Sequence, residues 1–392
     1  MKESLFNYRF EYENQKYIFN TNNNGLIQIN NDIFTEEERE YLRVNRFWVD
    51  DNEDEIALLE REINHNIQKR QKELELTIAL TNYCNFSCVY CYQNKNEKLM
   101  TTEVANMIIE KIDRILNDNI FEGINIHYFG GEPLLNIPVL IYLDENIKKI
   151  TDKIGIVYKA FLTTNGSMLS KELLQKVKFS SIQLTFDGLE KTHDRLRVSD
   201  HFHFKEEIEL IENIMNFSQA KVLLRTNICK ENKDEIIALH KYIFEKFGNE
   251  RIEINPNRTI KYHQDDSFEM LSVQEYAEVA YQIKLLWSEQ KGKFELPVPR
   301  STPCKFPYGN AYAISPEGYC TFCSGSMDQE KKYFFDVDIE NKKMFSVRKE
   351  CKKCNILPLC LGGCIIQYNL RAGACTYEKY ELKEMHTMTM PK

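Results

Sequence analysis

Between Leu74 and about Ile260, short apolar segments alternate with longer amphipathic ones. The short segments have the Ile, Val, Leu and aromatic content of strands, and the longer ones have the apolar spacing of helices. A strand, a helix and a second strand in series require a parallel sheet, because the helix returns the chain to the end where the first strand began. The sequence therefore predicts an α/β fold, with a partial (β/α)6, TIM-like barrel over residues 73–260 and chemistry at the carboxyl ends of its strands. The expected strands are residues 74–80, 124–129, 157–164, 181–186, 221–228 and 251–256.

Residues 1–72 precede this pattern and predict a separate module. Three strand candidates, residues 8–13, 16–21 and 26–30, are followed by helices that begin near Thr35 and Asp54. Strands followed by helices favour a winged-helix-like module. Its 15 acidic and 10 basic residues are the wrong balance for DNA phosphates, so peptide binding at a sheet edge fits better.

The remainder of the chain predicts two further regions. Residues 261–300 have the pattern of a helical linker that ends in a Pro-rich stretch. Residues 301–392 are rich in cysteine and poor in strand patterns. A chain of 392 residues exceeds what one hydrophobic core usually supports, so more than one domain is expected.

Composition limits the compartment and the partners. Hydrophobic residues make up 43% and charged residues 28%, a mixture typical of folded globular proteins. No apolar run approaches the roughly 18 residues of a membrane span, and the amino end lacks a signal-peptide pattern, so we expect a cytoplasmic protein with no membrane partner. The net charge of -8 argues against a nucleic-acid partner.

Twelve cysteines in such a chain indicate metal rather than disulfides. Cys84, Cys88 and Cys91 follow the first barrel strand, and Cys229 stands alone, as an inert core thiol would. A four-iron four-sulfur cluster held by three cysteines keeps one iron for another ligand, as catalysis requires. A zinc site is the alternative, but it needs a fourth ligand, and His127 is the one histidine at the end of a neighbouring strand.

The spacing Cys-x3-Cys-x2-Cys, with Tyr90 before the last cysteine, resembles the signature of the radical S-adenosylmethionine (radical SAM) superfamily. The resemblance implies that S-adenosylmethionine chelates the free iron through its amino and carboxylate groups. It also implies that an electron from the cluster breaks the sulfonium bond, and that the resulting 5'-deoxyadenosyl radical takes a hydrogen atom from the substrate.

Further motifs extend the resemblance along the barrel. Gly130, Gly131, Glu132 and Pro133 match the family's GGEP motif, which implies that they hold the methionyl amino group. By motif position, Thr185 and Arg197 would meet the methionyl carboxylate, with Arg195 as a competitor to Arg197, and Tyr90 would lie near the adenine. Arg225 in "LLRTN" is a further candidate for cofactor binding.

The cysteines near the carboxyl end resemble the SPASM pattern, which in relatives carries two auxiliary four-iron four-sulfur clusters. The resemblance assigns Cys351, Cys354, Cys360 and Cys375 to the second auxiliary cluster, and Cys304, Cys323 and Cys364 to the first. Cys320 is either the eighth ligand or a buried apolar residue that leaves one iron open. Zinc ribbons are the alternative for these CxxC pairs.

SPASM-bearing relatives mostly modify peptides or proteins, in two branches of similar layout. One crosslinks ribosomally made peptides through thioether or carbon-carbon bonds and often has an amino-terminal module that binds a leader peptide. The other, the anaerobic sulfatase maturases, oxidises a Cys or Ser to formylglycine. The 72 residues before the barrel, Phe129 where that second branch tends to have Gln, and Ser324 where it places an aspartate all favour the crosslinking branch.

The expected reaction starts with a leader strand that adds to the sheet edge near residues 22–30 and delivers the core peptide to the barrel. An external one-electron reductant, such as a flavodoxin or ferredoxin, would supply electrons to the radical cluster. An auxiliary cluster would remove the surplus electron of the reaction. No side chain is assigned as the base, because Glu132 and Asp187 both have competing duties. A non-enzymatic zinc-ribbon or winged-helix regulator is the alternative from another class.

Overall fold

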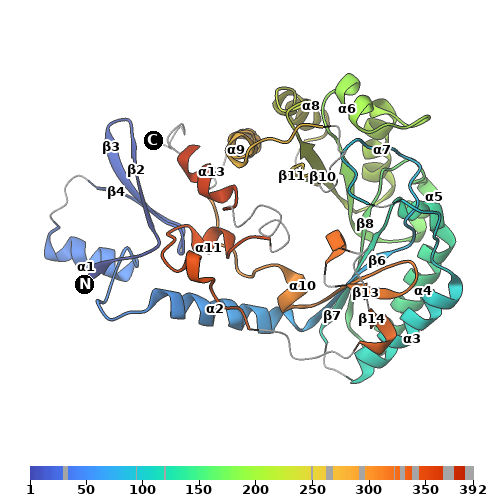
Figure 1. The fold of residues 1–392 in the computed structure, drawn as a ribbon, viewed down its shortest axis with the longest axis horizontal. Coiled ribbons are helices and arrows are strands. Elements are labelled where there is room, and N and C mark those ends of the chain that lie inside the picture. Colours follow the sequence, from blue (N-terminus) through green and yellow to red (C-terminus); the bar gives the residue numbers. More distant parts are fainter. Residues whose placement is uncertain are drawn as a thin grey trace. The chain divides into compact units, whose positions relative to one another are not determined.

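The computed structural model (Figure 1) describes residues 1–29, 34–93, 95–118, 121–248, 250–261, 268–290, 296–321, 323–326, 332–337, 344–364 and 375–384. The chain divides into two compact units. The first contains residues 1–69, 272–308 and 343–392, and the second contains residues 70–271 and 309–342. Residues 1–69 thus share a compact unit with distant parts of the chain.

The second unit is built on a sheet in which six strands lie side by side in chain order, all parallel. Each strand lies within about two residues of its predicted position. The predicted α/β fold with a parallel sheet is therefore confirmed. The strands are β6 (Glu73–Ala79), β7 (Gly123–Phe129), β8 (Val157–Thr163), β9 (Phe179–Thr185), β10 (Lys221–Ile228) and β11 (Ile252–Arg258).

Helices connect successive strands along the outside of the curved sheet (Figure 1). The first of them shows why they form: Ala105, Ile108, Ile112 and Ile115 recur every three or four residues, and all are buried. Another ends at Gly155, whose φ of 77° suits glycine. The helices are α3 (Thr102–Asp118), α4 (Ile137–Ile154), α5 (Lys171–Lys176), α6 (Glu190–Leu196), α7 (Phe204–Phe217) and α8 (Ile236–Phe247), with the 3-10 turn η1 (Pro133–Asn136) before α4.

Three strands from the cysteine-rich region extend the same sheet beyond β6. β12 (Asn310–Ile314) pairs with β6 in parallel, and β13 (Tyr319–Thr321) and β14 (Lys332–Tyr333) follow in antiparallel order. The sequence predicted a strand-poor region here and did not locate these three short strands. All five residues of β12 are buried, so its apolar run lacks the alternation that marks a strand with one face in water.

The amino-terminal part of the first unit contains the predicted strands and helices. β2 (Asn7–Tyr12), β3 (Gln15–Asn20) and β4 (Gly25–Ile29) form an antiparallel sheet in that order, and β1 (Lys2–Glu3) pairs with β5 (Trp48–Val49). α1 (Glu36–Val44) begins with the predicted capping box of Thr35 and Glu38, and α2 (Glu55–Arg70) follows. Strands precede helices as predicted, and the winged-helix comparison stays a prediction.

The two ends of the chain share a core in this unit. Phe6, Leu59 and Ile63 pack with Phe345 and Leu357.

None of the helices that the structure describes is long and apolar enough to cross a membrane. The remaining elements of the chain are α9 (Val273–Gln290), α10 (Lys305–Tyr308), α11 (Leu357–Cys360) and α13 (Glu378–Glu384), with the 3-10 turns η2 (Ser324–Ser326), η3 (Phe334–Asp336) and η4 (Lys349–Cys351).

Candidate functional site

The first three cysteines lie on a loop that is closed at its base. Met100 N donates to Leu80 O over 2.8 Å, so the chain leaves the loop beside the point where it entered. The buried amide of Asn136 donates to both carbonyl oxygens, at 3.2 Å to Leu80 and 2.9 Å to Met100. These bonds fix the cysteine loop, residues 80–100, at the carboxyl end of β6.

The three thiols of this loop lie near one another and are partly buried. Burial is the main cause that raises the pKa of Cys88 to about 12; the Arg197 guanidinium opposes this shift, and charge on Cys91 and Cys84 adds to it. Burial also raises the pKa of Cys84. Thiolates at these positions are favoured by nearby positive charge, which Arg197 supplies to Cys88 and which bound iron would increase.

Among the described side chains, no three His, Cys, Asp or Glu groups lie close enough together to bind one metal ion. A four-iron cluster uses a wider ligand set, because each thiolate binds a different iron. The loop carries three thiols, and their role as cluster ligands stays a prediction.

Gly130 and Gly131 pack directly against this loop. Gly131 N donates to Thr81 O and Glu132 N to Tyr83 O, both over 2.8 Å. A Cβ on Gly131 would lie 2.1 Å from Tyr83 O, and one on Gly130, where φ is 138°, would lie 2.3 Å from Thr81 O. The sequence suggested that these glycines approach a ligand; in the structure they allow the close approach of the cysteine loop.

Glu132 is fully buried and joins two strand ends. Its carboxylate accepts hydrogen bonds from Leu134 N at 2.9 Å, Thr164 Oγ1 at 2.6 Å and Asn165 N at 2.6 Å. Burial raises its pKa, and these donors oppose the shift. Both carboxylate oxygens of Glu132 accept hydrogen bonds, so Glu132 holds the "LTTNG" turn beside Pro133, the first residue of η1. Its contact with the amino group of the cofactor stays a prediction.

Asn165 connects that turn to the cysteine loop, and the sequence did not single it out. Its Nδ2 donates to Asn85 Oδ1 over 2.8 Å and lies 3.9 Å from Cys84 Sγ. Ser167 completes the contact by accepting from Asn85 Nδ2 over 3.0 Å. The sequence feature that could have identified this residue is an Asn in the turn after β8, because Asn side chains commonly form hydrogen bonds in turns.

Asp187 joins the ends of β9 and β10, as Glu132 joins the ends of β7 and β8. It is fully buried, and burial raises its pKa. Its carboxylate accepts from the hydroxyl of Tyr90 and, over 2.7 Å, from Asn227 N. Tyr90 also meets the edge of Phe268 with ring centroids 6.4 Å apart. Asp187 therefore fixes the end of the cysteine loop against the barrel.

The structure separates the two competing arginines. Arg195 is exposed and pairs with Glu231 over 2.6 Å. Arg197 is 6% exposed, and its guanidinium lies 5.3 Å from the ring centroid of Phe86. Arg197 thus lies inside the site beside the cysteine loop, and Arg195 lies at the surface.

Thr185 and Arg225 face each other across β9 and β10, each near the carboxyl end of its strand. Thr185 is 8% exposed, and Arg225 Nε donates to Asn227 Oδ1 over 2.9 Å. His127, the residue considered for zinc, lies 2.7 Å from Thr163 Oγ1 through Nε2. The predicted cofactor residues of the barrel therefore gather at one end of the sheet.

Four cysteines of the first unit also lie close together. Burial raises the pKa of Cys351, and charge on Cys354 and Cys375 would raise it further. Burial raises the pKa of Cys360 to about 12, with Cys354 again contributing. This set is the one assigned to the second auxiliary cluster.

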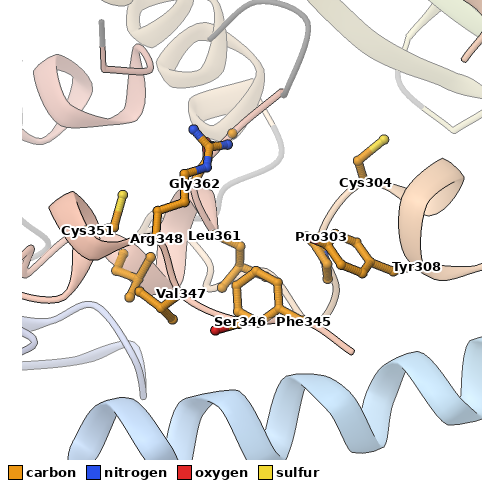
Figure 2. A pocket seen from close by; sticks show the side chains of 12 residues that line it. Pro303, Cys304, Tyr308, Phe345, Ser346, Val347, Arg348, Cys351, Leu361 and Gly362 are labelled. Atoms are coloured by element: carbon orange, nitrogen blue, oxygen red, sulfur yellow. The ribbon is translucent and has the colours of Figure 1, made fainter. Parts of the chain in front are cut away.

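A pocket of the first unit lies beside this set. Figure 2 shows Cys304 and Tyr308 on one side of the pocket and Cys351 and Arg348 on the other. Arg348 Nη2 donates to Gly362 O over 2.8 Å. Cys304 and Cys364 are exposed thiols of this unit.

The other predicted cluster ligands belong to the second unit. Cys320 lies on β13 and is 8% exposed, a burial that favours its role as an apolar residue. Cys323 Sγ accepts from Gly325 N over 3.3 Å. Cys229 is fully buried in a cluster with Leu196 and Phe268, as expected of an inert thiol.

Residues 78–243, which include the cysteine loop and the ends of β7 to β10, match the radical SAM superfamily. The chain contains a radical SAM domain. This domain implies S-adenosylmethionine and one four-iron four-sulfur cluster, and the protein is a radical SAM enzyme. The radical SAM part of the sequence prediction is confirmed.

Individual proteins resemble this radical SAM enzyme over more of its length. The radical SAM cyclopropyl synthase TigE of Paramaledivibacter caminithermalis is 24% identical over 354 residues, which cover 81% of this chain and 73% of TigE. Other curated relatives, GTP 3',8-cyclases among them, match over about half of their own length or less.

Two solved structures share its fold. Native anSMEcpe with bound S-adenosylmethionine has a TM-score of 0.63 at 20% identity, over 80% of this chain and 96% of that one. Streptococcus suis SuiB bound to its precursor peptide SuiA has a TM-score of 0.57 at 16% identity, over 96% of this chain and 98% of SuiB. Both likenesses concern the fold.

Proposed function

We propose that this radical SAM enzyme matures a ribosomally made peptide by forming a thioether or carbon-carbon crosslink. The observation that carries the proposal is the antiparallel sheet β2–β3–β4 ahead of the barrel, in which β4 is an edge strand. An edge strand offers backbone N–H and C=O groups to an added strand, which is how a leader peptide would bind. The proposed domains are a leader-binding module at 1–72, the barrel at 73–260, a linker at 261–300 and a SPASM domain at 301–392.

The comparisons support a peptide substrate. SuiB was solved with a precursor peptide, and its likeness covers 96% of this chain. TigE, a cyclopropyl synthase, matches over 81% of the chain. anSMEcpe was also solved with a peptide, and its likeness covers 80%.

The barrel residues have distinct proposed roles. Cys84, Cys88 and Cys91 hold the cluster, and the cofactor supplies a 5'-deoxyadenosyl radical when it is bound and reduced. The fit rests on two buried donors of Arg197, Nε and Nη2, which have no acceptor among the described residues and suit a carboxylate. The cofactor set that we propose is Tyr90, Gly130, Gly131, Glu132, Pro133, Thr185, Arg197 and Arg225.

The cysteine-rich region is proposed to hold two auxiliary clusters. Cys351, Cys354, Cys360 and Cys375 hold one, and the gathering of these four thiols supports that set. Cys304, Cys323 and Cys364 hold the other, with or without Cys320. A flavodoxin or ferredoxin supplies electrons to the radical cluster.

The proposed reaction is a two-electron oxidation of the peptide. Loss of a hydrogen atom from a carbon of the core peptide leaves a carbon radical. A cysteine sulfur of the same peptide gives up its proton and bonds to this carbon. An auxiliary cluster held by the carboxyl-terminal cysteines would accept the surplus electron. For a carbon-carbon crosslink, a second carbon takes the place of the sulfur and releases its proton.

One experiment separates this function from its two alternatives. The protein is purified without oxygen, its iron, sulfide and zinc are measured, and it is incubated with S-adenosylmethionine, a reductant and the small peptide encoded beside its gene. A crosslinked product has lost the mass of two hydrogen atoms and does not react with a hydrazide. Formylglycine, the product expected of a sulfatase-maturase-like enzyme, reacts with the hydrazide. Zinc with little iron would indicate the zinc-ribbon regulator and would overturn the proposal.

A further inference from the structure

A buried carboxylate beside Arg197 lacks the hydrogen bonds that such a group normally has. Glu207 of α7 is fully buried, and neither of its carboxylate oxygens accepts a hydrogen bond from a residue that the structure describes. Its Oε2 lies 4.0 Å from Arg197 Nε and 3.2 Å from His193 Nε2. Because an unpaired buried charge is strongly unfavourable, the Arg197 guanidinium is the neighbour whose charge balances Glu207.

The Arg197 guanidinium is held in place although two of its hydrogen-bond donors, Nε and Nη2, have no acceptor among the described residues. Segments on either side of it bond to the cysteine loop, through Ser87 N to Val198 O at 2.8 Å and Val89 N to Leu196 O at 3.0 Å. The ring of Phe86 covers the guanidinium at 5.3 Å. Charge attraction from Glu207 and this ring thus fix the guanidinium while Nε and Nη2 keep their hydrogens for another acceptor.

His193 is itself fixed in the direction of Glu207. Its ring packs against both Phe186 and Phe204, with each centroid 5.5 Å away. Asp187 N donates to its Nδ1 over 3.5 Å, which leaves the hydrogen of the neutral ring on Nε2, the nitrogen that lies 3.2 Å from Glu207 Oε2. His193 thus positions the Glu207 carboxylate, and Glu207 in turn positions the Arg197 guanidinium.

We infer that Glu207 and His193 are positioning residues for S-adenosylmethionine, which hold the Arg197 guanidinium so that its unused donors bind the methionyl carboxylate. The inference rests on the proposed cofactor role of Arg197 and extends it to a carboxylate and an imidazole outside the motifs. At 4.0 Å, Glu207 attracts the guanidinium without occupying Nε, which a carboxylate at hydrogen-bonding distance would do.

The test measures binding rather than turnover. The reconstituted protein is titrated without oxygen with S-adenosylmethionine and, separately, with its decarboxylated analogue, which lacks the group that Arg197 would bind. Glu207→Gln keeps the shape of the side chain and removes its charge. We expect the Kd of this variant for S-adenosylmethionine to rise about tenfold or more, with its Kd for the analogue within about twofold of wild type.

Three further variants keep the result interpretable. Glu209→Gln, at an exposed position of the same helix, should bind both ligands as wild type does. Glu207→Asp keeps the charge and should recover part of the affinity. His193→Phe keeps a ring packed against Phe186 and Phe204 and should weaken binding of S-adenosylmethionine alone, which decides the question if Glu207→Gln does not fold.

Two outcomes overturn the inference by itself. One is a Glu207→Gln protein with unchanged affinity for S-adenosylmethionine. The other is an equal loss of affinity for both ligands, which is the result of a merely structural role. A wild-type protein that binds no S-adenosylmethionine overturns the proposed function as well, so the two failures are distinct.

Discussion

Asn355 donates through Nδ2 to the backbone oxygen of Asn7 over 3.1 Å, and the backbone oxygen of Asn355 accepts from the hydroxyl of Thr21. Asn355 follows Cys354 directly, and Cys354 packs against the apolar clusters that contain Phe6 and Phe10. The sheet proposed to bind a leader and the cysteines proposed to hold a cluster are therefore parts of one packed structure.

Replacing Asn355 with Ala should loosen this structure. The buried oxygen of Asn7 would lose its donor, which costs about 1 to 3 kcal/mol. We expect faster hydrogen exchange in residues 7–21, measured by mass spectrometry. Lys352→Ala, at an exposed position of the same turn, is the control. Equal exchange in both variants would contradict the expected coupling.

Replacing Gly131 with Ala should prevent assembly of the radical cluster. The added Cβ would lie 2.1 Å from Tyr83 O, so the cysteine loop must move away. We expect the iron content to fall by about four atoms per chain, with loss of the corresponding visible absorption. Gly155→Ala adds a Cβ with nothing within 4 Å, although its φ of 77° disfavours Ala, and should retain its iron. Full iron content in Gly131→Ala would refute the steric argument.

Cys88 and Cys229 should respond differently to replacement by Ala. Both have a pKa raised by burial, to about 12 and about 11 respectively, so neither is a reactive free thiol. We expect Cys88→Ala to lose about four irons, because it removes a proposed ligand, and Cys229→Ala to lose none. Iron analysis and the electron paramagnetic resonance spectrum of the reduced protein check this. Equal iron in the two variants would exclude Cys88 as a ligand.

His240 should make the protein less stable in mild acid. Burial lowers its pKa from 6.5 to about 3, and its Nε2 lies 3.2 Å from Thr226 Oγ1. Between these values the unfolded chain binds a proton that the folded chain does not, so the free energy of unfolding falls as the pH falls. The loss from pH 7 to pH 5 is about 2 kcal/mol.

Urea unfolding of the wild type and of His240→Gln at both pH values measures this contribution. The variant should lose less stability on acidification than the wild type does. His201→Gln, at an exposed position, should behave as the wild type. A variant with the same pH dependence as the wild type would count against His240 as the source.

Local sequence patterns predicted much of the barrel and the location of its site. The strand positions follow from apolar runs, and the capping box at Thr35 and Glu38 forms as predicted, because both depend on residues close in the chain. The cysteine loop and the GGEP turn follow β6 and β7 for the same reason. The order of parallel strands then brings their ends together.

Contacts between distant segments were not predictable in this way. The bonds of Glu132 to the "LTTNG" turn depend on the register of β7 and β8, and those of Asp187 to Asn227 on the register of β9 and β10. Glu207 and His193 lie outside every motif, on helix faces whose periodicity predicts burial but not a polar partner. β12 escaped prediction because a fully buried strand has no alternating pattern.

The pairing of β12 with β6 has a consequence for synthesis on the ribosome. β6 emerges before the other barrel strands, yet one of its edges gains its partner only when residues 310–314 have been made. Until then the nascent sheet exposes a row of unpaired backbone groups next to the loop that carries three thiols. Protection of this edge of β6 in the growing chain therefore depends on the synthesis of residues 310–314.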